Sequence, residues 1–148
     1  MRETVGVYIE LCHPDAKKPE YARPGDAGMD ICALEDTYIA PGSTVIVRTG
    51  LKLAIPAGYE IQIRPRSGLS LKSPLRVANS PGTIDSGYRE EVGIIMHNTS
   101  RQEVCSIKKG DRIAQLVLQR VPAIRWIQVD SVNGIGTNRG GGFGSSGR

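Results

Sequence analysis

The chain has 148 residues, which is enough for one domain with a hydrophobic core and too few for two. Apolar residues make up 39% of the chain, and its 18 glycines and nine prolines exclude a fold of long helices. The net charge of +4 comes with 13 Arg against 6 Lys, a bias that suits phosphate binding but is equally typical of a solvated basic surface, and there is no basic run with interleaved aromatics to indicate nucleic-acid binding.

Neither a disulfide framework nor a zinc site is expected. The three cysteines, Cys12, Cys32 and Cys105, are an odd number without CxxC spacing. The N-terminal residues lack the apolar run of a signal peptide, and no apolar stretch approaches the roughly 20 residues that span a bilayer. We therefore expect a cytoplasmic protein with reduced thiols and no membrane partner.

Short strands follow one another along the chain. Apolar residues recur at every second position in several segments, which is the pattern of half-buried strands, and Pro/Gly turn sequences separate them. The pattern predicts strands over residues 5–11, 37–39, 45–47, 51–55, 59–63, 92–96, 113–118 and 124–129, with one short helix near 68–72. This spacing is typical of an all-β sandwich, jelly roll or barrel, and we expect a single domain over residues 1–133.

Residues 134–148 differ in composition from the rest of the chain. Seven of these fifteen residues are Gly, and only Ile135 and Phe143 are large and apolar, so we expect a flexible arm. Either the arm is a tail without consequence, or it closes over a ligand that Phe143 covers. Residues 142–147 match GxGxxG, but a dinucleotide fingerprint opens a helix and this chain ends one residue later. These residues could still bind phosphate locally through their backbone N–H groups.

Two further polar segments are candidate sites. Residues 64–70 place two Arg, a Ser and a Gly directly after a predicted strand, which is either an anion cradle or an ordinary turn with solvated Arg. Residues 79–88 are rich in turn residues and precede the strand at 92–96, so they predict a β-hairpin that presents Asp85. The alternative is that Asp85 caps its own backbone in an Asx-turn.

Taken in order, five segments resemble the trimeric dUTP pyrophosphatases (dUTPases). They are residues 27–33, 65–69, 82–89, 110–116 and 139–147. The resemblance implies a jelly-roll-like dUTPase β-barrel, a homotrimer with active sites shared between subunits, and Mg²⁺-dependent hydrolysis of dUTP to dUMP and pyrophosphate. That activity limits uracil in DNA and supplies dUMP for dTMP synthesis.

The resemblance also implies roles for individual residues. Asp85 corresponds to the general base that directs water at the α-phosphorus, and Tyr88 to the ring that leaves no room for a 2′-hydroxyl. Asp30 corresponds to a residue near the phosphates and metal; we expect only an indirect role, because Mg²⁺ prefers triphosphate oxygens and water. The remaining substrate-binding residues fall into three groups: Asn79, Thr83, Ile84 and Gly93 at the uracil; Arg66, Ser67, Gly68 and Gln115 at the phosphates; and Arg139, Phe143, Gly144 and Ser145 in the arm.

Two positions depart from the family pattern. Arg139 lies one residue closer to Phe143 than is usual, and Glu90 stands where Gly usually follows Arg89. Glu90 would strain the backbone if that position required a positive φ. Two alternatives stay open: a dCTP deaminase-related enzyme, for which Glu90 or Glu91 would have to act on cytosine, and a dUTPase-like nucleotide-binding regulator without turnover.

Overall fold

The structure is a computed structural model that describes residues 1–144 and 147. Over these residues the chain is nearly all β, with a single short helix, α1 (Ser67–Lys72). The strands are β1 (Tyr8–Leu11), β2 (Met29–Cys32), β3 (Thr37–Ile39), β4 (Thr44–Arg48), β5 (Leu51–Ala54), β6 (Tyr59–Arg64), β7 (Leu75–Val77), β8 (Gly82–Ile84), β9 (Gly93–Asn98), β10 (Cys105–Ile107) and β11 (Arg112–Arg120).

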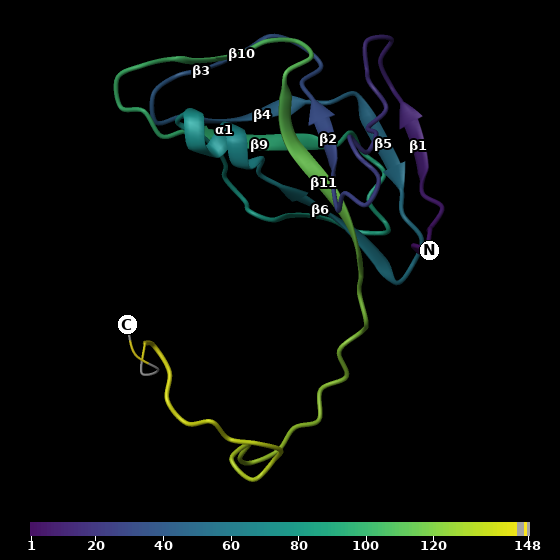
Figure 1. The fold of residues 1–148 in the computed structure, drawn as a ribbon, viewed down its shortest axis with the longest axis vertical. Helices are drawn as coiled ribbons and strands as arrows, with labels where there is room; N and C mark the ends of the chain where they lie inside the picture. The colour runs from purple at the N-terminus through teal and green to yellow at the C-terminus, as the bar shows by residue number, and fades with distance from the viewer. Residues whose placement is uncertain (145–146, 148) are drawn as a thin grey trace.

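The strands form four antiparallel sheets that surround one core (Figure 1). The largest has the order β2-β11-β6-β8, and a three-stranded sheet has the order β4-β9-β7. Two pairs, β1-β5 and β10-β3, complete the barrel. Most neighbours in these sheets are distant in the sequence, so the jelly-roll-like arrangement depends on long-range pairing rather than on consecutive hairpins.

Alternation of side chains explains why these segments form strands. In β9, Ile94, Met96 and Asn98 are fully buried while the residues between them are only partly so, and in β6 Ile61 and Ile63 point inward in the same way. The core is made of branched aliphatic side chains, in keeping with the low aromatic content. Its most buried large members are Ile31, Ile39, Leu51, Ile94, Met96, Ile107 and Ile113.

Most of the predicted elements are confirmed. The helix near 68–72 and seven of the eight predicted strands are present, with small shifts at their ends. The predicted strand over residues 124–129 is wrong: the chain leaves the barrel after β11 and runs away from it (Figure 1), so no strand of the described chain lies beside that segment. Its apolar side chains are exposed, Trp126 at 86%.

Three further observations bear on the sequence expectations. No helix within the described residues is long and apolar enough to cross a membrane. Cys12, Cys32 and Cys105 are all free thiols. Glu90 has an ordinary φ, since Phe143 is the one residue other than Gly with a positive φ among those described, so the concern about strain at Glu90 is unfounded.

Candidate active site

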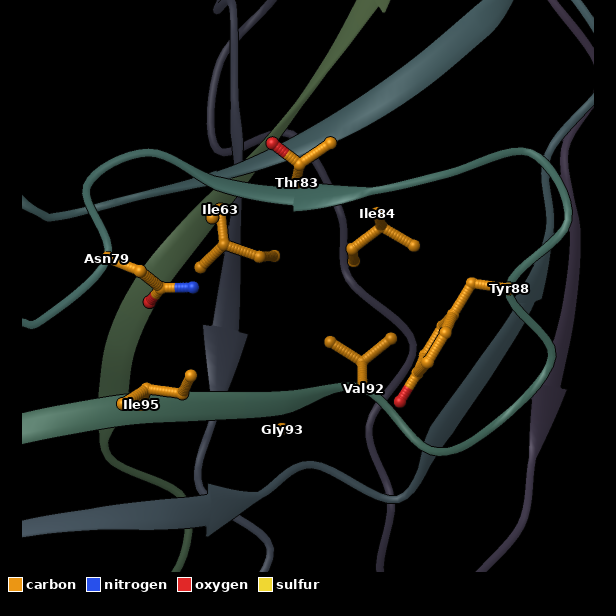
Figure 2. A pocket seen from close by; sticks show the side chains of 9 residues that line it. Ile63, Asn79, Thr83, Ile84, Tyr88, Val92, Gly93 and Ile95 are labelled. Carbon is orange, nitrogen blue, oxygen red and sulfur yellow. The ribbon is translucent and has the colours of Figure 1, made fainter.

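A slot lies between β8 and the start of β9, with a volume of about 200 Å³ (Figure 2). Ile84 and Val92 face each other across it, Tyr88 closes one end, and Asn79 directs its amide into it from the other. Its walls are aliphatic apart from the Asn79 amide, the Tyr88 ring and the strand backbones, and the Thr83 side chain points away from it. The complete lining is Ile63, Asn79, Gly82, Thr83, Ile84, Tyr88, Val92, Gly93 and Ile95.

The slot exists because two strands that are close in sequence belong to different sheets. β8 is the edge strand beside β6, whereas β9 pairs with β4 and β7. β7 pairs with β9 only from Asn98 to Met96, and one further hydrogen bond runs from the Ala78 N–H to the Ile95 carbonyl. Beyond it, no described strand pairs with that edge of β9 at Gly93. The predicted hairpin is therefore wrong in its pairing: β8 and β9 present two unpaired backbone edges to the slot instead of bonding to each other.

Glycine is required where β9 passes β4. Gly93 pairs with Arg48, and a Cβ built on Gly93 would overlap the Ile46 Cγ2. A side chain at Gly93 would therefore have to displace the exposed Ile46 side chain or shift β9. The sequence identified Gly93 as a site residue, and the structure explains its lack of a side chain by packing on the β4 side.

Asp85 follows the slot-lining Ile84 and lies in an exposed turn. The Tyr88 N–H donates to the Asp85 backbone carbonyl at 3.1 Å, which closes the turn. The Asp85 carboxylate itself accepts no hydrogen bond and makes no ion pair with any described residue. The Asx-turn alternative is therefore not what the structure contains, and the carboxylate is free to accept a proton from a ligand or a water molecule beside the slot.

Arg66 is the centre of a second group of polar side chains, which we call the arginine cluster: Asp30, Arg66, Arg112 and Gln115. Its Nε donates to Asp30 Oδ1 at 2.9 Å and its Nη1 to the Arg112 carbonyl at 3.2 Å. Arg112 Nη1 lies 3.6 Å from Asp30 Oδ2, and Gln115 Nε2 donates to the Pro65 carbonyl at 3.0 Å. The cluster joins β2, β11 and the end of β6.

The arginine cluster is suited to an anion. Ser67 and Gly68 follow Arg66 as the exposed first turn of α1, where backbone N–H groups have no partner within a helix. The two guanidinium groups of Arg66 and Arg112 outnumber the one carboxylate of Asp30, so the cluster has a net positive charge that faces solvent. The sequence identified Arg66, Ser67, Gly68 and Gln115 but missed Arg112, although it lies in the fourth of the five quoted segments, opposite Cys32 in the register of β2.

Asp30 is poorly placed to bind a metal ion directly. Arg66 and Arg112 approach both of its oxygens, so a cation would have to displace one of them. The described residues contain no group of three or more His, Cys, Asp or Glu side chains that could hold a metal. If Mg²⁺ enters this site, the donor set therefore fits one held mainly by ligand phosphates and water.

The structure does not bring the arm residues to either group. Arg139, Phe143 and Gly144 lie on the exposed segment beyond β11, and the Phe143 side chain is fully exposed. Ser145 lies outside the described residues. Within the described chain no residue belongs to both the slot and the arginine cluster, and no hydrogen bond connects their side chains.

A small β-barrel that carries an aliphatic slot for a flat ring and an arginine cluster for an anion belongs to a class suited to nucleotides. Comparison with known proteins identifies the family: the dUTPase family model matches residues 15–147, and the chain belongs to the dUTPase family.

Similarity to individual members extends over the whole chain. The deoxyuridine 5′-triphosphate nucleotidohydrolase of Solibacter usitatus is 47% identical, covering 96% of this chain and 96% of that protein. The solved dUTPase of Staphylococcus bacteriophage 80alpha, in complex with dUPNHPP, superimposes with a TM-score of 0.89 at 28% identity and covers 98% of this chain and 100% of that one. A point mutant of the dUTPase from phage phi11 of S. aureus, studied for the coordination of a structural Mg(II) ion, has a TM-score of 0.80 at 26% identity and covers 86% and 98%.

Proposed function

We propose that this protein hydrolyses dUTP to dUMP and pyrophosphate, with the slot for the deoxyuridine and the arginine cluster for the phosphates. Membership of the dUTPase family and the names of its relatives support this activity over the deaminase and the regulator without turnover. The observation that carries the mechanism is the unengaged Asp85 carboxylate, next to a slot of the right size for a pyrimidine.

Asp85 is the general base in this proposal. An ionised carboxylate takes a proton from a water molecule as that water attacks the α-phosphorus. The new bond joins the water oxygen to the α-phosphorus, the bond to the α–β bridging oxygen breaks, and pyrophosphate leaves. Charge that develops on the phosphates is stabilised by Arg66 and by the backbone of Ser67 and Gly68, with Gln115 holding the loop in place. Mg²⁺ bound with the triphosphate would neutralise further negative charge.

The slot supplies base and sugar selection. The Asn79 amide and the free edge of β8 at Thr83 and Ile84 offer fixed donors and acceptors to the edge of uracil, and the β9 backbone at Gly93 lines the opposite wall of the slot. Cytosine has the opposite pattern at that edge, so these groups would be covered by the base and left without partners. In this proposal the Tyr88 ring, at the end of the slot, packs under the deoxyribose and excludes a 2′-hydroxyl.

We also propose that the active protein is a homotrimer with shared sites. The slot and the arginine cluster share no residue within one chain, which supports sites completed by a neighbouring chain. Apolar side chains beyond β11 also have nothing to pack on within the described part of a single chain; they include Ile124, Trp126, Ile127, Val132 and Ile135. The arm would then bring Arg139 to the γ-phosphate and Phe143 onto the uracil of a neighbouring site, closing it against water. The division into a barrel over 1–133 and an arm over 134–148, and the cytoplasmic location, stay predictions of the sequence.

The function is tested by incubating the protein with dUTP, dCTP and UTP in the presence of Mg²⁺ while following pyrophosphate and ammonia. Pyrophosphate from dUTP alone is the expected result. Ammonia from dCTP would establish the deaminase instead, and nucleotide binding without product would establish the regulator.

A further inference from the structure

The turn that carries Asp85 and Tyr88 is attached to the barrel at its C-terminal end, through Glu91. The Tyr88 hydroxyl donates to the Glu91 backbone carbonyl at 2.9 Å, so the position of the ring depends on the position of Glu91. Figure 2 shows the ring at the end of the slot with its hydroxyl directed past Val92 toward the start of β9. The other side-chain bonds of the turn, from Arg89 to the carbonyls of Ser86 and Tyr88, are internal and fix nothing to the barrel.

Arg48 holds the Glu91 side chain in a two-point contact. Arg48 Nε donates to Glu91 Oε2 at 3.1 Å and Nη2 donates to Oε1 at 2.9 Å. A guanidinium fork on a carboxylate fixes orientation as well as distance, which one ammonium group cannot do. Cys12 Sγ approaches the same Oε1 at 3.6 Å, which links the end of β1 to the pair. The Arg48 hydrogen bonds lower the pKa of Glu91 below its ordinary value, which keeps the carboxylate charged.

The backbone after Glu91 is anchored to the same segment of the barrel. The Val92 N–H donates to the Leu51 carbonyl at 2.7 Å, and the buried Thr49 hydroxyl donates to the Val92 carbonyl at 2.5 Å. Residues 48–51 therefore hold Glu91 by its side chain and Val92 by its backbone. Val92 and Tyr88 both line the slot, so this attachment sets the geometry of one of its ends.

We propose that Arg48 and Glu91 are positioning residues that fix Tyr88 against the sugar and so set how strictly the site prefers dUTP over UTP. This inference rests on the proposed dUTPase activity and on the proposed role of Tyr88, and it adds two residues to the specificity of that site. The Arg48 side chain is 45% exposed and that of Glu91 22%, so solvent weakens the attraction between their charges, whereas the two-point contact still fixes the position of Glu91.

The test compares Arg48→Met and Glu91→Gln with the wild type through kcat/KM for dUTP and for UTP. We expect the ratio of kcat/KM for dUTP to kcat/KM for UTP to fall by about tenfold. That change lies within the range of interaction free energies measured between residues in contact. KM for dUTP should rise more than kcat falls, because Asp85 is not substituted and the preceding residue, Ile84, stays paired with Ile61 of β6. Arg48→Lys keeps the charge but loses the fork, so it should restore only part of the ratio.

Three controls separate positioning from a general structural effect. Arg120→Met breaks another exposed Arg–Glu pair, with Glu3, and should leave the ratio unchanged. Tyr88→Phe removes the hydroxyl through which the proposal acts, so adding Arg48→Met to it should lower the ratio no further. Melting temperatures of all variants check that the fold is intact; if Arg48→Met is unstable, Glu91→Gln and Arg48→Lys decide the question.

Failure of the inference and failure of the function give different results. If the wild type hydrolyses dUTP but the Arg48 and Glu91 variants keep the wild-type ratio, the inference is wrong and the function stands. If the wild type shows no turnover, the ratio of dissociation constants for dUMP and UMP, measured by calorimetry, replaces the kinetic ratio. An unchanged binding ratio in the variants would then overturn the inference independently.

Discussion

Gln115 lies between Asp30 and Arg64 in the register of three neighbouring strands. Its amide also donates to the Pro65 carbonyl, so one residue of β11 fixes the start of the loop that presents Arg66. Gly28 makes this possible, because a Cβ at that position would overlap Gln115 Oε1.

Gly28→Ala should therefore damage catalysis more than folding. The added methyl group displaces the Gln115 amide and shifts the loop that carries Arg66, and misplacement of about 1 Å at such a site can reduce kcat/KM by roughly ten- to a hundredfold. Steady-state kinetics with dUTP measure the effect. Gly6→Ala is the matched control, since nothing lies within 4 Å of a Cβ at Gly6, and it should be neutral in activity. Equal activity of the two variants would contradict the role given to Gln115.

Asp85→Asn should abolish turnover and preserve binding. The amide cannot take a proton from water, so we expect kcat to fall by at least about a hundredfold, while the dissociation constant for dUMP changes little. Glu90→Gln is the control, because it removes one exposed negative charge from the same turn. Hydrolysis by Asp85→Asn at a rate near that of the wild type would show that another group activates the water.

Shared sites predict complementation between two inactive variants. Asp85→Asn spoils the slot side of a site and Arg66→Met spoils the phosphate side. When the two chains are unfolded and refolded together at equal amounts, about a quarter of the sites should be intact, since three quarters of random trimers are mixed and one site in three of each is undamaged. Activity of the refolded mixture measures this, and refolding each variant alone provides the baseline. No recovery would mean that each chain forms its own complete site.

Removal of residues 138–148 should reduce activity without unfolding the barrel. These residues, as far as they are described, add nothing to the core, so the melting temperature should hardly change. Loss of the closing segment should reduce kcat/KM by at least roughly tenfold. Phe143→Ala isolates the contribution of the aromatic ring. A large fall in melting temperature on truncation would show that the arm is a structural part of the assembly.

How far the sequence could predict the structure depended on strand length and on distance along the chain. Alternating strands such as β5 and β6 were found from their period, because burial on one face imposes it. The strands that were missed, β2, β7, β8 and β10, have three or four residues each. β1 and β5 are as short, but they lie within longer alternating segments, and β3 was predicted despite its three residues.

Which strands pair with each other could not be predicted from the sequence, for a different reason. The turn residues around Gly82 and Gly87 correctly indicated a reversal of the chain, but a local pattern cannot reveal that β8 bonds to β6 and β9 to β4. Likewise, the apolar residues at 124–129 indicated burial without indicating a partner. Asp85, Tyr88 and Arg66 could be proposed as site residues because they lie in recognisable segments, whereas the contact of Arg48 with Glu91 joins residues 43 apart in the sequence.

The slot has a consequence for how this protein can change over evolutionary time. Ile84 and Val92 are at once members of the core, 7% and 2% exposed, and the facing walls of the slot. Because one comes from each of two sheets, any substitution that alters how those sheets pack also alters the width of the opening between them. Mutational drift that a barrel would ordinarily tolerate in its interior is therefore restricted here, and the same restriction offers a route by which distant core changes could retune the choice of base.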